Sequence, residues 1–174
     1  MTAALPILHN EFGLDLNDIE FDSNLQRLII TKWNWNYNLA LNCQLHLLEW
    51  VKSSYERSVI IFCNHSCSYT VGKGLQKKKG LEKYNLQDFN PDLMGNLNYP
   101  LFQVKRGGGL TFHHPGQWVC YPIIHLPTWG LDVSKITSLL LNTCGSILSE
   151  MALITDYSTE EELIGLWVNE KKIA

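Results

Sequence analysis

The sequence lacks several features that mark whole classes of protein. None of its apolar runs approaches the roughly 20 residues that a helix needs to cross a membrane. The chain does not open with a basic segment followed by an apolar run, so no secretory signal is visible. Basic residues do not exceed acidic ones, 14 against 17, whereas nucleic-acid-binding domains carry a basic excess. We therefore expect neither a membrane nor a nucleic acid among its partners.

A disulfide framework and the common cofactor motifs are also missing. The cysteines are odd in number: Cys43, Cys63, Cys67, Cys120 and Cys144. Thiols in a reducing compartment fit this better than disulfides, and without an Arg-rich transit segment we expect the cytoplasm, or the mitochondrial matrix in a eukaryote. Cys63 and Cys67 lack the second cysteine pair of a zinc site. No P-loop or dinucleotide fingerprint occurs, so we expect no metal and no cofactor.

The composition that remains is that of a globular protein. The 174 residues, 45% of them hydrophobic, are enough for one domain with a core. Residues 1–24 are acidic and lack clear periodicity, so we interpret them as a loosely ordered leader before a domain over residues 25–174. Apolar, β-branched segments then predict strands at residues 25–33, 58–64, 100–105, 117–126 and 163–168. Pro122 in one of them indicates an edge strand or a bulge.

Helices are predicted where apolar residues recur at helical spacing. One buried face is marked by residues four positions apart: Leu39, Cys43, Leu47 and Val51. Asp132 stands where an N-cap is expected, before a second helix. The last predicted strand can turn at residues 169–172 into another that begins at Ile173. Elements in this order predict an α+β fold with a mixed or antiparallel β-sheet.

The segment RGGGLTFHHPGQ, residues 106–117, is the most informative stretch. Three glycines directly after a predicted strand let the backbone approach a ligand with no Cβ in the way, although a plain glycine-rich hairpin would look the same. Arg106 can fix the loop through carbonyls or carboxylates, or meet an anionic group of a ligand. His113 and His114 favour a pocket rim. They are poor metal ligands, because neighbouring residues of a strand point to opposite faces.

Three motifs give the chain a resemblance to the lipoyl(octanoyl) transferase family over residues 25–174. RGGGLTFHHPGQWVCYPIIHL resembles the family signature Arg-Gly-Gly-x-x-Thr-Phe/Tyr-His-Gly-Pro-Gly-Gln, followed by Tyr-Pro and a leucine. NHSCSYTVG is similar to the family's Glu-His-x-Pro-x-Tyr-Thr-x-Gly through His65, Tyr69, Thr70 and Gly72. GLWVNEKKIA is similar to the family's Gly-x-Trp/Tyr-Val-x-x-x-Lys-Ile-Ala/Cys.

The resemblance implies a fold and a reaction. The fold is a mixed sheet flanked by helices, shared with biotin- and lipoate-protein ligases. In the reaction, the octanoyl group of octanoyl–acyl carrier protein passes to an enzyme cysteine and then to a lysine of a lipoyl domain, the first step of endogenous protein lipoylation. The implied acceptors are the lipoyl domains of 2-oxoacid dehydrogenase E2 subunits and the H protein of glycine cleavage.

The resemblance also implies the residues of the site. Those that match the family's substrate-binding stretch are Arg106, Gly107, Gly108, Gly109, Leu110, Thr111, Phe112 and His113. Lys172 matches the family's catalytic lysine, which tunes the thiol of the nucleophilic cysteine. The chemistry is consistent, because thioester exchange needs a thiolate, a nearby lysine favours the thiolate, and backbone N–H groups stabilise an oxyanion.

The chain departs from the family at two points. The family's nucleophilic cysteine lies a few dozen residues beyond the catalytic lysine, and this sequence ends two residues after Lys172. We therefore expect a fragment, incomplete at its C-terminus, rather than an enzyme that has lost its nucleophile, and we expect Cys120 to be a core residue. His114 replaces a family glycine. It is strained if that position needs a positive φ, and otherwise it crowds the pocket rim.

Two other functions fit parts of the sequence. An ATP-dependent lipoate-protein ligase would carry Asp-x-Gly-Asn where this chain has His114, Pro115, Gly116 and Gln117, so the transferase is favoured. A non-catalytic protein that binds acyl chains or lipoyl domains is the other alternative. The missing nucleophilic cysteine is the one feature that supports it.

Overall fold

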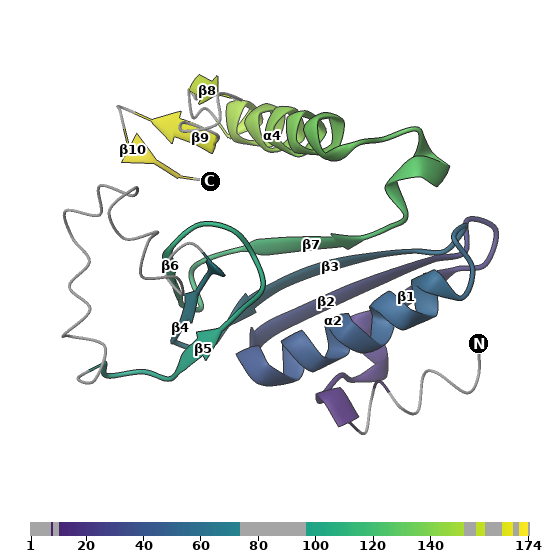
Figure 1. Ribbon diagram of the computed structural model, residues 1–174, viewed down its shortest axis with the longest axis horizontal. Helices are drawn as coiled ribbons and strands as arrows, with labels where there is room; N and C mark the ends of the chain where they lie inside the picture. The colour runs from purple at the N-terminus through teal and green to yellow at the C-terminus, as the bar shows by residue number, and fades with distance from the viewer. Residues whose placement is uncertain are drawn as a thin grey trace. The chain divides into compact units, whose positions relative to one another are not determined.

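A computed structural model describes residue 8 and residues 11–73, 97–151, 156–158, 165–168 and 171–173. The chain divides into two compact units, Met1–Ile124 and His125–Ala174, and each carries its own strands (Figure 1). Within the described residues, no helix is long and apolar enough to span a bilayer.

The first unit is built around a four-stranded sheet with the order β1-β2-β3-β7. Its strands are β1 (Ile19–Asp22), β2 (Arg27–Trp35), β3 (Ser58–His65) and β7 (Val119–Ile123). β2 and β3 are parallel, whereas the two outer pairs are antiparallel, so the predicted mixed sheet is confirmed. Pro122 lies in β7, which ends this order in the described part of the chain, and an edge strand tolerates proline there.

Helix α2 (Tyr37–Lys52) supplies the crossover that parallel β2 and β3 require, and it covers one face of the sheet (Figure 1). The Asn36 side chain caps its first turn by accepting hydrogen bonds from the N–H groups of Asn38 and Leu39. The core packs the buried side of the helix against β2 and β3, with Leu28, Ile30, Ala40, Cys43, Leu47, Val51, Val59 and Ile61. The four-residue spacing therefore predicted this helix and its buried face correctly.

A second, three-stranded sheet of the first unit carries the glycine-rich segment. Its order is β5 (Leu101–Gln103), β4 (Ser68–Val71) and β6 (Leu110–His113), with β4 in the middle. β4 is parallel to β5 and antiparallel to β6. The strand predicted at residues 100–105 is confirmed as β5. β4 and β6 escaped prediction because each is only four residues long and adjoins glycine, which leaves no room for an alternating pattern.

Residues 11–24 are not the loosely ordered leader expected from the sequence. Phe12 and Leu14 are buried in the core, and β1 pairs with β2 along its whole length. A short 3₁₀ helix, η1 (Leu16–Asp18), precedes β1. The acidic composition was misleading because two of the carboxylates form ion pairs with a partly buried lysine of the sheet.

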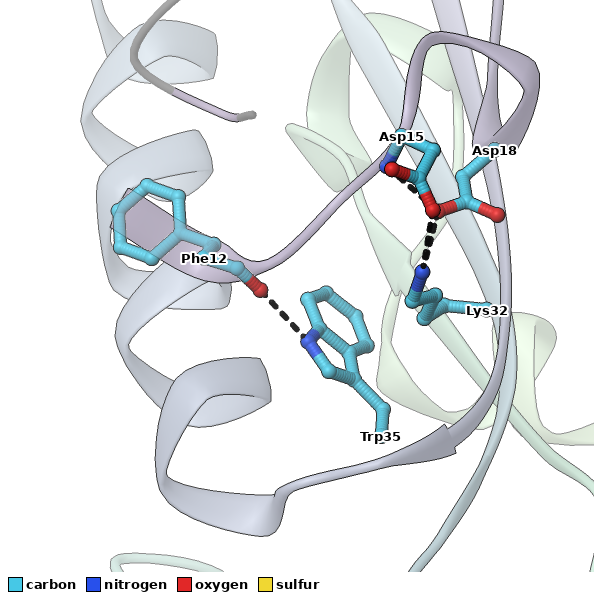
Figure 2. Close-up of polar contacts among 5 residues, drawn as sticks. All are labelled: Phe12, Asp15, Asp18, Lys32 and Trp35. Atoms are coloured by element: carbon cyan, nitrogen blue, oxygen red, sulfur yellow. Dashed lines mark hydrogen bonds and ion pairs between the residues drawn. The ribbon is translucent and has the colours of Figure 1, made fainter. Parts of the chain in front are cut away.

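That lysine is Lys32 of β2, whose ammonium lies 2.7 Å from Asp18 and 3.3 Å from Asp15 (Figure 2). The hydrogen bond to Asp18 is the main reason that the pKa of Lys32 is raised. In the same region the indole N–H of buried Trp35 donates to the carbonyl of Phe12 at 2.8 Å (Figure 2). The N-terminal segment is thus fastened to β2 by both charge and a buried hydrogen bond.

The second unit contains helix α4 (Val133–Glu150) and a three-stranded antiparallel sheet. The Asp132 carboxylate accepts a hydrogen bond from the N–H of Lys135 at 2.8 Å, which confirms the predicted N-cap. A 3₁₀ helix, η4 (Leu126–Trp129), precedes α4. The strands have the order β10 (Lys171–Lys172), β9 (Gly165–Val168) and β8 (Asp156–Ser158). The predicted C-terminal hairpin is β9–β10, although its second strand includes the two lysines that were expected in the turn.

Candidate functional site

The glycine run lies against the end of β4, where residues 104–109 connect β5 to β6. Two backbone hydrogen bonds hold it there. The N–H of Lys73 donates to the carbonyl of Arg106 at 2.9 Å, and the N–H of Gly72 donates to the carbonyl of Gly109 at 3.0 Å. The loop of residues 106–109, here called the glycine loop, is therefore anchored to β4 at both of its ends.

Gly72 makes this close approach sterically feasible. A Cβ at this position would lie 2.5 Å from the carbonyl oxygen of Gly107 and 2.6 Å from that of Gly108. Gly108 itself has a φ of +72°, a left-handed conformation in which side chains with a Cβ are strained. Gly107 differs, because a Cβ built there would meet no atom within 4 Å.

Arg106 holds the glycine loop through its guanidinium group. Nη1 donates to the Gly107 carbonyl at 2.9 Å. Nη2 lies within hydrogen-bond distance of the Thr70 carbonyl and hydroxyl, at 3.0 and 2.8 Å, and of the Thr111 hydroxyl at 2.7 Å. Of the two roles left open by the sequence, the geometry favours fixing the loop, because Arg106 donates to carbonyl and hydroxyl oxygens of its own chain.

The glycine loop presents backbone donors. Within the described part of the chain, the N–H groups of Gly107, Gly108 and Gly109 donate to no protein acceptor. Gly107 and Gly108 are exposed, and Gly109 is partly so. Successive N–H groups of this kind make a concavity suited to an anionic or strongly polarised oxygen.

His113, at the end of β6, is buried and does not lie at an open rim. Its Nδ1 is 2.7 Å from the Gln117 side-chain oxygen, and its Nε2 is 3.2 Å from the Thr70 hydroxyl. Burial is the main cause that lowers the pKa of His113. The ring is therefore neutral near pH 7. Gln117 belongs to the motif of residues 106–117, but the sequence did not predict its contact with His113.

The eight residues expected to bind substrate do not form one surface. Along β6, Thr111 and His113 face Arg106 and Thr70, whereas Phe112 points to the opposite face, as strand alternation requires. Phe112 is 39% exposed and lies in an aromatic cluster with Tyr69, Tyr99 and His114. Leu110 lies two residues before Phe112 in β6, so its side chain points to the same face as that of Phe112. The structure brings Arg106, the glycines, Thr111 and His113 together and separates Phe112 from them.

A second buried histidine, His65 at the end of β3, packs beside His113. Its Nδ1 lies 3.1 Å from the Trp35 carbonyl, and its Nε2 lies 3.0 Å from the Tyr121 hydroxyl. Because a carbonyl only accepts, Nδ1 carries the proton and Nε2 accepts from Tyr121. Burial lowers the pKa of His65 to about 4. The ring of Tyr37, the first residue of α2, contacts His65 and His113 at centroid distances of 4.9 and 5.2 Å.

The sequence held no signal for Tyr37 or for Asn64, another buried residue of the site. Asn64 accepts a hydrogen bond from the N–H of Asn34, which has a φ of +51° at an irregularity in β2, and donates to the carbonyl of Pro115. It therefore joins the large sheet to the turn that follows β6. Asparagine is common in loops and turns, so its place in the apolar run of β3 gave no hint of this role.

His114 is accommodated without backbone strain. Among the described residues, positive φ outside glycine occurs at Gln26 and Asn34 and not at His114. The imidazole is exposed, and its Nδ1 accepts a hydrogen bond from the N–H of Gly116 at 3.0 Å. A Cβ at Gly116 would lie 2.9 Å from the ring of His114, so a side chain there would displace the imidazole from this contact. The side chain thus stabilises the turn of residues 114–117 instead of filling a pocket.

Lys172 belongs to the second unit. It is exposed in β10, pairs with Trp167 of β9 and places its ammonium 6.0 Å from the centre of the Trp167 ring.

Burial raises the pKa of Cys43 and Cys63 to about 12, so neither is a thiolate at neutral pH. The expectation that Cys120 is a core residue is wrong, because its side chain lies on an exposed position of β7. Cys144 of α4 is exposed as well.

Comparison with known proteins places this geometry in a family. The chain belongs to the family of the Lipoyl protein ligase A/B catalytic domain, whose model matches residues 36–174. It is 30% identical over 135 residues to an octanoyltransferase of Caldanaerobacter subterraneus subsp. tengcongensis, a match that covers 75% of this chain and 53% of that protein. It is 29% identical over 142 residues to the chloroplastic octanoyltransferase LIP2p2 of Arabidopsis thaliana, covering 82% and 46%. The chain spans about half the length of the curated relatives it matches.

The fold has a counterpart among solved structures. Protein Ta0514 of T. acidophilum, assigned as a lipoate protein ligase, superposes with a TM-score of 0.51 at 19% sequence identity. The match covers 76% of this chain and 55% of that protein. The predicted α+β fold of the biotin- and lipoate-protein ligase type is thereby confirmed.

The close approach at Gly72 gives a first prediction. We expect Gly72→Ala to lower the stability of the first unit by about 1–3 kcal/mol, because the new Cβ overlaps two backbone carbonyls that cannot move independently. Gly107→Ala is the matched control, since its Cβ meets open space. Urea unfolding followed by circular dichroism measures both. Equal effects of the two substitutions would show that the loop does not pack on Gly72.

The buried neutral histidines give a second prediction. The pKa of His65 is about 4 in the folded chain and about 6.5 in the unfolded one, so the unfolded chain binds more protons between these values. Stability is therefore full above pH 7 and is lost as the pH falls from 6.5 toward 4, by up to about 3 kcal/mol from this residue. His113 acts in the same direction.

Urea unfolding at a series of pH values tests this linkage. We expect His65→Gln to lower the stability at neutral pH and to flatten its decline in acid. His125→Gln, which removes a histidine of the other unit, should leave the slope unchanged. A decline as steep in His65→Gln as in the parent chain would remove His65 from this account.

Proposed function

We propose that the chain is the acyl-binding part of an octanoyltransferase, which moves an octanoyl group from octanoyl–acyl carrier protein to a lysine of a lipoyl domain. The glycine loop is the observation that carries the proposal: Arg106 holds it, and within the described residues its N–H groups donate to no protein acceptor. Membership of the ligase A/B family and relatives named octanoyltransferase support the same reading.

The loop suits the carbonyl of a thioester. In acyl transfer this carbonyl becomes a tetrahedral oxyanion, and the N–H groups of Gly107, Gly108 and Gly109 are donors for that oxygen. Arg106, Thr111 and the glycines line the bound thioester in this proposal, and His113 supports Arg106 through Thr70. Leu110 and Phe112 lie on the other face of β6, so they do not contact the same thioester. Each methylene of the acyl chain that is buried adds about 0.8 kcal/mol to binding.

The proposed reaction has two steps. A cysteine thiolate attacks the thioester carbonyl, a new C–S bond forms, and the carrier thiol leaves with a proton. The lysine amine of the lipoyl domain then attacks the enzyme thioester, an amide bond forms, and the cysteine is released as a thiol. Lys172 carries the proton between these thiols and stabilises the thiolate. The nucleophile is a cysteine other than Cys43 and Cys63, whose raised pKa values keep them protonated.

The partners and the compartment follow from this activity. The donor is octanoyl–acyl carrier protein, and the acceptors are the lipoyl domains of 2-oxoacid dehydrogenase E2 subunits and the H protein of glycine cleavage. These proteins share the cytoplasm of a bacterium or the interior of an organelle, and we place this chain there with them.

An intact-mass assay tests the proposal. The protein, as the cell makes it, is incubated with octanoyl–acyl carrier protein and a lipoyl domain, and in parallel with octanoate, ATP and the same domain. We expect octanoyl addition to the lipoyl domain in the first mixture without ATP. Addition only in the second mixture would favour a ligase instead, and binding of the octanoyl carrier without any transfer would favour a non-catalytic protein.

The paired lysines of β10 supply a matched test of the catalytic assignment. We expect Lys172→Ala to abolish transfer while the circular dichroism spectrum is unchanged, because no other group is assigned to move the thiol proton. Lys171→Ala, one residue away in the same exposed strand, should retain transfer. Full turnover in Lys172→Ala, or equal losses in both variants, would refute the role given to Lys172.

A further inference from the structure

The buried ring of His113 has both nitrogens occupied by the protein itself. Nδ1 lies 2.7 Å from Gln117 Oε1 and Nε2 lies 3.2 Å from Thr70 Oγ1. The Thr70 hydroxyl oxygen lies in turn 2.8 Å from Arg106 Nη2. These contacts form a continuous relay from Gln117 through His113 and Thr70 to Arg106.

The chemistry of the relay assigns each proton. A guanidinium only donates, so Thr70 Oγ1 accepts from Arg106 and keeps one hydrogen of its own to donate. The histidine ring is the acceptor within reach, which leaves Nε2 without a proton. Nδ1 then carries the ring proton and donates it to the amide oxygen of Gln117. In this arrangement each of the three contacts of the relay pairs one donor with one acceptor.

The other protonation states of the ring leave a group unsatisfied or place like charges together. With the proton on Nε2, the Thr70 oxygen would accept from both Arg106 and His113, and its own hydrogen would lose the ring as an acceptor. The unprotonated Nδ1 would then face the Gln117 oxygen, so two acceptors would meet with no hydrogen between them. An imidazolium would satisfy Gln117, but it would place a second positive charge beside Arg106 in a buried setting. The backbone of Gln117 is held in place separately from the relay, because its N–H donates to the His114 carbonyl at 2.9 Å.

We propose that Thr70 and Gln117 are positioning residues that hold His113 as the neutral imidazole protonated on Nδ1, and that this relay fixes Arg106 against the glycine loop. His113 then acts on the ligand through Thr70 and Arg106 and does not touch it. What the loop binds rests on the function proposed above, whereas the state of the ring does not.

The state of the ring is measured directly in the full chain. Two-bond ¹H–¹⁵N correlation spectra of ¹⁵N-histidine-labelled protein at pH 7 distinguish a protonated from an unprotonated ring nitrogen, and the spectrum of His113→Gln identifies the signals of His113. We expect a protonated Nδ1 and an unprotonated Nε2. A proton on Nε2, or a ring that averages between the two forms, would overturn the proposal.

Isosteric variants test the two positioning residues. We expect Thr70→Val and Gln117→Met to abolish the single tautomer, and Thr70→Ser, which retains the hydroxyl, to preserve it. Thr128→Val is the matched control, because the Thr128 hydroxyl contacts Nδ1 of His125 at 2.8 Å in the other unit. An unchanged His113 signal in both Thr70→Val and Gln117→Met would overturn the relay.

Calorimetric titration with S-octanoyl pantetheine connects the relay to binding. We expect Thr70→Val to weaken binding about tenfold or more, the usual effect of losing a hydrogen bond to a charged group, and Thr70→Ser to bind like the parent. Equal weakening in both would show that the hydroxyl is not what matters. If the parent chain binds no thioester, the proposed function fails, and the ring spectra still decide the relay.

Discussion

The Arg106 guanidinium cross-links three segments of the candidate site, namely the glycine loop, β4 and β6. It bonds to the carbonyl of its neighbour Gly107, to both oxygens of Thr70 in β4, and to the hydroxyl of Thr111 in β6. A planar fork of donors suits this task better than a lysine ammonium, because its directions are fixed. Arg106 therefore reinforces the backbone hydrogen bonds that anchor the glycine loop to β4.

Other features of the site accommodate that arrangement. Gly72 has no Cβ, so the loop can lie directly on the end of β4. His65, His113 and Tyr37 pack ring against ring, and both imidazoles are neutral near pH 7 because burial lowers their pKa values. Because both imidazoles are neutral, they do not repel the nearby Arg106 guanidinium, and His113 still forms a hydrogen bond with Thr70. Asn64 joins the large sheet to the turn that follows β6.

Much of the fold was predictable because it depends on local patterns. The β-branched runs predicted β2 and β3, the four-residue apolar spacing predicted α2, and Asp132 marked the start of α4. β1, β4 and β6 were missed because short strands beside acidic or glycine residues show no period. The prediction that Cys120 is a core residue was wrong, because apolar neighbours along the chain do not show which face of a sheet is buried.

The candidate site was predictable in part. The motif located Arg106, the glycines and His113, but their roles depend on contacts between residues far apart in sequence. Thr70 lies 36 residues before Arg106 and Tyr37 far before His113, so neither partnership leaves a local trace. Polar partners such as buried Asn64 and half-buried Gln117 are visible only once the chain is folded.

The most direct test concerns what Arg106 does. If it fixes the loop by directed hydrogen bonds, charge alone is not enough. We therefore expect Arg106→Lys to weaken binding of S-octanoyl pantetheine about as much as Arg106→Gln, with amide exchange of residues 107–109 accelerated in both. Near-normal binding in Arg106→Lys together with weak binding in Arg106→Gln would contradict this, because it would mean that the cation meets an anionic group of the ligand.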